Sequence, residues 1–75
     1  MSEVTDKIVA MLDQARVTRD RIREEGGDTT LAQEQLDRTQ AILDAHNAGR
    51  RWQEPMESLL QWQGKVGPIG SSKTE

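Results

Sequence analysis

The sequence predicts an all-α fold, with a long antiparallel helical hairpin, a short third helix and a flexible C-terminal tail. Two observations lead to this prediction. Apolar residues recur three and four positions apart over two long segments, and glycines follow each segment. The chain has 75 residues and no cysteine, so we expect one domain without disulfides. We place that domain at residues 1–65 and the tail at 66–75.

The first predicted helix spans residues 3–25, with Ser2 as its N-cap and Gly26 after its end. One face carries an apolar stripe at heptad spacing that is longer than the second helix can cover, which leaves apolar surface for a second copy of the chain. The sequence therefore predicts a homodimer in which two hairpins form a helical bundle. The predicted dimer core comprises Val4, Ile8, Met11, Ala15 and Ile22.

The second predicted helix spans residues 31–47. Thr30 and Gln33 have the spacing of a capping box, in which each side chain accepts a bond from a backbone N–H of the first turn, with Asp28 and Thr29 as competing caps. The link between the first two helices is only about five residues long. Such a short link predicts that the two helices lie antiparallel.

The third predicted helix is short, at residues 55–63, with Pro55 in its first turn and Gly64 as its C-cap. The only aromatic residues, Trp52 and Trp62, lie in or beside this segment. Tryptophan and arginine dominate the energy of many protein interfaces, and an Arg-Arg-Trp triplet stands here. We therefore predict a partner-binding surface made of Arg50, Arg51, Trp52, Met56, Leu59 and Trp62.

Catalytic and metal-binding patterns are not found in the sequence. The chain has a single histidine, His46, which we interpret as a surface or cap residue, and it lacks every common ligand spacing. We therefore expect no enzyme activity, no cofactor and no metal. No apolar run reaches the roughly 20 residues that cross a bilayer, and the first residues do not resemble a signal peptide. A cytoplasmic protein is the expectation.

The charge balance disfavours a nucleic-acid-binding protein, because 13 acidic residues outnumber 10 basic ones and the net charge is −3. Arg16, Arg19 and Arg23 nevertheless share one face of the first predicted helix. A solvated, partly paired surface is the favoured interpretation of this face, and a contact to acidic or phosphate groups is the alternative.

The sequence thus predicts a small non-enzymatic protein-binding regulator, an adaptor or inhibitor that occludes a site on a larger protein. One alternative is a dimeric nucleic-acid-associated regulator that uses the arginine face, and another is a structural subunit of a larger assembly. Analogy with other small acidic helical proteins suggests a bacterial or phage source. Nucleic-acid binding would weaken steeply with salt, whereas an apolar contact centred on tryptophan would not.

Overall fold

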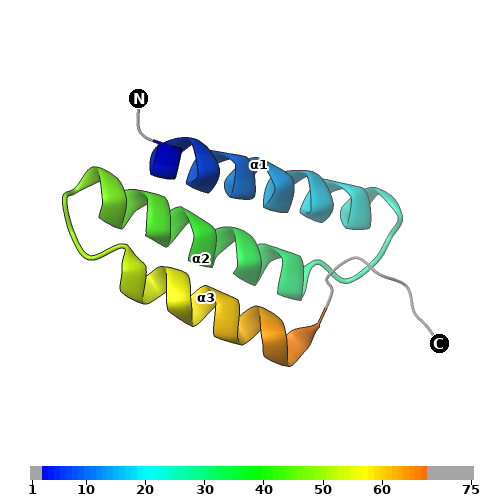
Figure 1. Cartoon of the computed structure of the whole chain (residues 1–75). Coiled ribbons are helices and arrows are strands. Elements are labelled where there is room, and N and C mark those ends of the chain that lie inside the picture. The colour runs from blue at the N-terminus through cyan, green and yellow to red at the C-terminus, as the bar shows by residue number, and fades with distance from the viewer. Residues whose placement is uncertain (1–2, 68–75) are drawn as a thin grey trace.

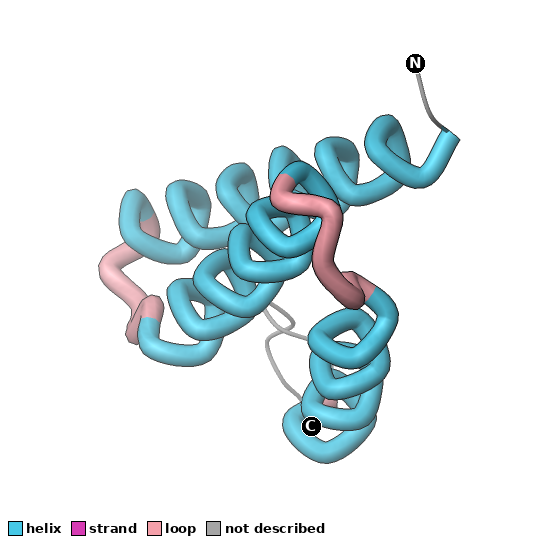
Figure 2. Tube along the Cα trace, turned by 90° about the vertical axis from the view of Figure 1, so that its left-hand side faces the viewer, coloured by secondary structure: helices cyan, strands magenta, loops and turns pink. Residues whose placement is uncertain are grey.

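The computed structural model describes residues 3–67, which form three α-helices and no strand. These are α1 (Glu3–Glu24), α2 (Thr30–Asn47) and α3 (Gln53–Val66). Successive helices run antiparallel with α2 in the middle (Figure 1), and the turned view in Figure 2 shows α1 and α3 flanking it. No Cα atom of α1 lies within 8 Å of a Cα atom of α3. The helical backbones therefore leave a space between α1 and α3 beside α2.

Two glycines end α1, as the sequence predicts. Gly26 has a φ of +80°, and its N–H donates to the carbonyl of Arg23 at 3.0 Å. The N–H of Gly27 donates to the carbonyl of Ile22 at 2.9 Å, which completes a Schellman motif. A Cβ atom at Gly27 would lie 2.9 Å from Cγ2 of Ile22, so both positions favour glycine. The predicted N-cap, Ser2, lies outside the described residues.

The predicted capping box at the start of α2 is wrong. Thr29 is the N-cap residue and makes no side-chain cap bond. The Asp28 carboxylate instead accepts bonds from the Thr30 hydroxyl at 2.6 Å and from the Thr30 backbone N–H at 2.9 Å. Both bonds favour the ionised carboxylate and therefore lower the pKa of Asp28 below its ordinary value. The bond from the hydroxyl has the larger effect. The Gln33 side chain turns elsewhere and accepts a bond from Arg19 at 3.3 Å.

The sequence predicts the third helix at residues 55–63, and α3 extends beyond this range at both ends. Pro55 lies in the first turn, where a missing N–H removes no helical bond, so the helix begins two residues before it. Gly64 is inside the helix rather than its cap. Gly67, with a φ of +76°, follows the last helical residue, and its N–H donates to the carbonyl of Gln63 at 2.9 Å. Val66 therefore belongs to α3 and not to the predicted tail, and residues 68–75 lie outside the described part of the chain.

The centre of the core is a cluster that takes one large aliphatic side chain from each helix. Ile8 of α1, Ile42 of α2 and Leu59 of α3 are each 0 % exposed and form one cluster. Burying such a side chain contributes about 1.5–3 kcal/mol to folding. The buried hydroxyl of Thr39 donates to the backbone carbonyl of Gln35 at 2.7 Å, so this polar group is satisfied. The cluster joins all three helices, although the backbones of α1 and α3 stay apart.

Candidate protein-binding groove

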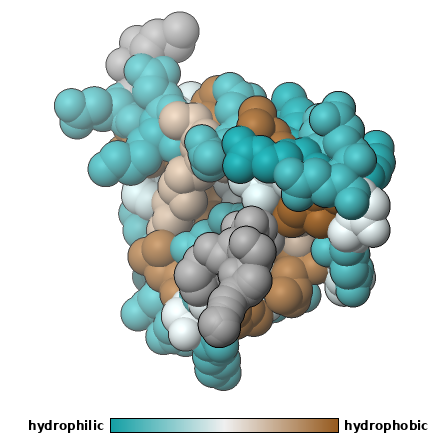
Figure 3. Space-filling model, turned by 90° about the vertical axis from the view of Figure 1, so that its right-hand side faces the viewer, coloured by the Kyte–Doolittle hydropathy of each residue, from teal (hydrophilic) through white to brown (hydrophobic). Residues whose placement is uncertain are grey.

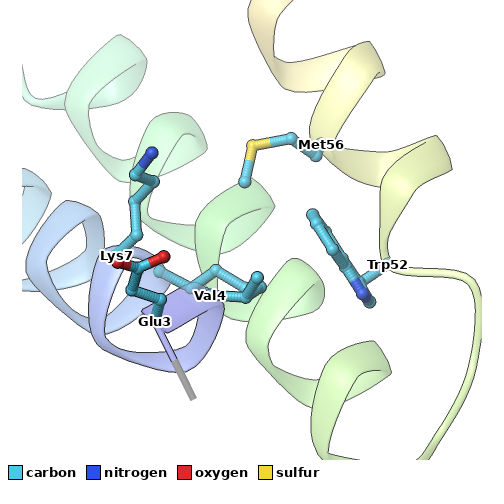
Figure 4. Close-up of a pocket in the computed structure, with 6 residues that line it drawn as sticks. Glu3, Val4, Lys7, Trp52 and Met56 are labelled. Carbon is cyan, nitrogen blue, oxygen red and sulfur yellow. The ribbon is translucent and has the colours of Figure 1, made fainter.

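A hollow of about 350 Å³ opens between the start of α1 and the start of α3 (Figure 4). Its lining is Glu3, Val4, Lys7 and Ile8 from α1 with Trp52 and Met56 from the other side. In Figure 4, Val4 and Met56 point toward a common space in front of α2, and the indole of Trp52 forms its far wall. Ile8 is fully buried, so it forms the base of the hollow. The first hollow is therefore apolar at its centre and charged along its α1 edge.

A second hollow of about 380 Å³ follows the same two helices further along. Its lining is Lys7, Ala10, Met11 and Gln14 from α1, Gln35 and Thr39 from α2, and Gln63 from α3. Lys7 lines both hollows, so they adjoin each other at this residue. We call the two hollows together the α1–α3 groove. Its sides are α1 and α3, and α2 contributes to its base.

Trp52 is held in place from the side facing α2. Its ring meets the ring of His46 edge to face, with centroids 5.9 Å apart and planes inclined at 61°. The Nδ1 atom of His46 lies 3.4 Å from the hydroxyl of Thr5 on α1, within hydrogen-bonding distance. His46 is thus a half-buried link between all three helices rather than the free surface or cap residue that the sequence predicts. This link orders the indole before anything enters the groove.

The groove carries one cation and one anion. Lys7 makes no ion pair within residues 3–67, although Glu3 lies one helical turn before it. Lys7 is exposed, so its ammonium remains hydrated and available. The remaining polar groups of the groove are mainly side-chain amides, those of Gln14, Gln35 and Gln63. Among the described residues, the groove therefore offers an apolar contact surface with one unpaired positive charge, the Lys7 ammonium, where the two hollows adjoin.

The structure divides the predicted partner-binding residues among four environments. Trp52 and Met56 line the groove. Leu59 is 0 % exposed and belongs to the core, which corrects its assignment to a contact surface. Arg50 and Arg51 are both exposed in the loop before α3. Nη1 of Arg51 lies 3.5 Å from Oε2 of Glu54. These residues therefore do not form one continuous surface.

Trp62 is the sixth predicted partner-binding residue, and it lies against α2. The guanidinium carbon of Arg38 is 5.2 Å from the centroid of its ring, a cation–π geometry. Arg38 is held there by Glu34, whose carboxylate lies 2.9 Å from Nη2. Trp62 also packs against the core cluster. Its role is to attach α3 to α2.

The predicted dimer core is used largely inside the single chain. Ile8 is 0 % exposed and Ala15 is 1 % exposed without any second copy. Val4 and Met11 pack partly against the core and line the groove, and Ile22 is half-buried beside Gly27. The heptad spacing indicated a buried face but not what covers it. Dimerisation itself stays a prediction.

The arginine face of α1 is mostly paired. Arg16 lies 3.8 Å from Asp13, and Arg19 lies 3.0 Å from Asp20. Arg19 also reaches across to α2, as described above. Only Arg23 of the three predicted contact residues has no ion pair within residues 3–67. The face therefore offers little unpaired positive charge.

Sequence reasoning missed the α1 side of the groove, above all Lys7. A usable signal was present: Val4, Lys7 and Met11 are spaced three and four positions apart, so a cation lies along the apolar face. That pattern shows which face Lys7 shares, but not that α3 stands opposite. The contact depends on two loops and on residues some fifty positions apart in the sequence.

Two further features of residues 3–67 concern metal binding and membranes. No three histidine, aspartate or glutamate side chains of this part of the chain gather closely enough to hold a metal ion. None of its helices combines the length and the apolar character needed to cross a membrane. The chain matches no known protein family, no curated protein and no solved structure.

Proposed function

We propose that this protein is a non-enzymatic protein-binding regulator, an adaptor or inhibitor, whose contact surface is the α1–α3 groove. One observation carries the proposal. α1 and α3 flank α2 without backbone contact, and Val4, Trp52 and Met56 line the open space between them. A chain that filled its own groove would bury these side chains completely. Here they are only half-buried.

The chemistry of the groove supports a protein ligand. Tryptophan and methionine are enriched at the centres of protein interfaces, where the indole supplies a large rigid surface and the thioether adapts to the partner. The amides of Gln14 and Gln63 give the second hollow a polar rim. An apolar centre with a polar rim is the usual arrangement of such interfaces.

The nucleic-acid alternative has less support. The groove is lined by one lysine and one glutamate, and two of the three arginines on the α1 face are paired with acids. Dimerisation through the apolar stripe of α1 is not part of the proposal either, because Ile8 and Ala15 are buried within one chain. The groove needs no second copy to form.

The test is affinity capture from host extract with the wild-type chain and two variants. Trp52→Ala removes the wall of the groove, and Leu60→Ala is the matched control, since Leu60 is 56 % exposed on α3 outside the groove. We expect wild type and Leu60→Ala to capture the same protein at low and high salt. The amount that Trp52→Ala captures should fall about thirtyfold or more. Circular dichroism must show that the helices persist. Equal capture by all three chains, or nucleic acid that is released by salt, would reject the proposal.

A further inference from the structure

The α1–α3 groove has the shape and charge of a receptor for one kind of protein segment. We infer that its occupant is an amphipathic α-helix of a partner protein, with two apolar side chains two turns apart and an acidic side chain between them. Such a helix would complete a four-helix bundle with α1, α2 and α3. The inference rests on the proposed function and specifies the partner segment.

The walls of the groove select a helix over an extended peptide. α1 and α3 use their own backbone groups in helical bonds, so the groove presents side chains and no free strand edge. An extended peptide would enter with unpaired backbone N–H and C=O groups, which are costly to bury. A helix has these groups already paired and presents only side chains.

The spacing of the hollows sets the spacing of the anchors. Along α1 the first hollow is lined by residues 3–8 and the second by residues 7–14, so their centres lie about five residues, or about 7.5 Å, apart. On the α3 side the first hollow is lined by Trp52 and Met56 and the second by Gln63, an offset of about nine residues, or about 13.5 Å. The mean of the two offsets is about 10.5 Å, which is the rise of about seven helical residues, or two turns. Apolar anchors at i and i+7 of a docked helix therefore match the two hollows.

Lys7 fixes the charge and register of the incoming helix. It stands where the hollows adjoin and has no ion pair within residues 3–67, so an acidic side chain between the two anchors lies opposite it. Glu3 lies at the outer end of the first hollow and repels a second acid there. An ion pair that a docked helix shields from solvent is screened by salt less than an ion pair on the open surface.

A second copy of this chain is a poor occupant. The large apolar side chains that are exposed among residues 3–67 are Val9, Val17, Leu31 and Leu60, and none lines the groove. They lie on three different helices, and at the end of the molecule in Figure 3 the visible apolar patches are separated by hydrophilic side chains. No described helix face therefore offers the stripe that the groove would receive.

The chain's own C-terminal segment is also a poor occupant. Residues 68–75 contain a single large apolar side chain, Ile69, among proline, glycine and serine. Such a segment has one anchor rather than two, and its composition does not favour a helix. The choice between these occupants is nevertheless part of the test.

The experiment uses the full chain with Trp62→Phe, so that Trp52 is the sole fluorescent indole. The probe is an alanine–glutamine peptide of about 18 residues, long enough to form a helix, with leucines at i and i+7. Glutamates at i+3 and i+4 lie between the leucines, one on each side of the apolar seam, so one acid faces α1 in either orientation. Control peptides replace both leucines with glutamine, or both glutamates with lysine. Titrations follow Trp52 emission and peptide helicity.

We expect the leucine–glutamate peptide to bind and gain helicity, and the glutamine control to bind at least tenfold more weakly. Lys7→Glu should weaken binding of the glutamate peptide about tenfold and strengthen binding of the lysine peptide. Lys7 is exposed, so we expect this variant to keep the fold, and circular dichroism is the check.

Three outcomes of the peptide titrations would overturn the inference. They are equal binding of the leucine and glutamine peptides, no response to the charge exchange at Lys7, or binding only after residues 68–75 are removed. A groove already filled by a second copy would be detected as a dimer by sedimentation, and it would overturn the inference too. If the peptides fail while capture from extract still depends on Trp52, the proposed function stands and only the helical occupant is wrong.

Discussion

The two ends of α3 use the same residue type for different purposes. At its start, Trp52 packs on the core cluster on one side and stands beside a hollow that no described side chain fills on another, with His46 against one edge of its ring. Near its end, Trp62 lies beneath the guanidinium of Arg38 and packs on the core cluster. The two indoles are ten positions apart, one at the N-cap of α3 and one inside the helix, and both are half-buried.

This difference shows that surroundings decide the role of a tryptophan. Arg38 and α2 cover one face of Trp62, so its burial contributes to attaching α3. Trp52 has α1 across from it, but the α1 backbone stays too far away to close the gap. An indole with one face open is ready for another surface. We therefore propose the start of α3 as the end that binds a partner, whereas its far end attaches the helix to α2.

The largest expected effect tests whether the base of the groove is core. Ile8→Asp would place a carboxylate at a position that is 0 % exposed, and we expect it to cost about 4 kcal/mol or more in unfolding free energy. The neighbouring residue gives a control, because Val9 is 39 % exposed and Val9→Asp should cost little. Urea denaturation followed by circular dichroism measures both. A stable Ile8→Asp chain would mean that the groove is open to its base.

The next effect separates the two indoles. Both indoles pack on the core cluster, and Trp62 also lies beside the Arg38 guanidinium, so we expect Trp62→Ala to lower the free energy of unfolding by about 2–3 kcal/mol. Trp52→Ala should cost less, about 1–2 kcal/mol, because one side of that ring faces a hollow, yet it should abolish most partner capture. Thermal and urea unfolding of both variants give the ratio of the two stability losses. Equal losses of stability would remove the distinction between the two ends.

The smallest effect lies far from both indoles, at the turn before α2. The pKa of Asp28 is lowered by its bonds from Thr30, so the folded state favours the carboxylate over the acid. Its contribution to stability is complete above the unfolded pKa of about 3.8 and is lost as pH falls through the lower folded value. We expect Asp28→Ala to lower the melting temperature slightly at neutral pH. The gap between variant and wild type should close in strong acid.

Thr30→Val would provide the matched control for that experiment, because it removes the hydroxyl bond and keeps the carboxylate. Its melting temperature should fall between those of wild type and Asp28→Ala at neutral pH. A gap that widened in acid would show that the acid form of Asp28 is the one that caps the turn.

Much of the fold follows from local sequence patterns. The sequence predicts α1 and α2 to within one residue at each described end, because glycine at 26 and 49 and the apolar spacing are local signals. α3 is less well predicted. Pro55 and Gly64 suggested its boundaries, but proline is harmless in a first turn, and glycine inside a helix costs only about 1 kcal/mol. Packing of α3 on α2 exceeds that cost.

The candidate site could be predicted only in part. Trp52 and Met56 were identified from residue type, whereas Lys7 and Val4 were not placed opposite them, because no local pattern shows which helix faces which. The apolar stripe of α1 correctly predicted that Ile8 and Ala15 lie on a buried face, but it did not show which helices cover that face. Leu59 was misassigned for the same reason, since an apolar residue at helical spacing suits core and contact surface equally.

The separation of α1 from α3 also bears on how the molecule opens. α1 and α3 each have α2 as their one neighbouring helix backbone, and α3 meets α2 over the smaller contact, so α3 has the fewest interactions to lose. Local unfolding follows the weakest set of contacts, and amide protons of α3 should exchange with solvent sooner than those at the centre of α2. A ligand seated between α1 and α3 would give α3 a second neighbour. Slower amide exchange throughout α3 would then accompany binding, even where no residue touches the ligand.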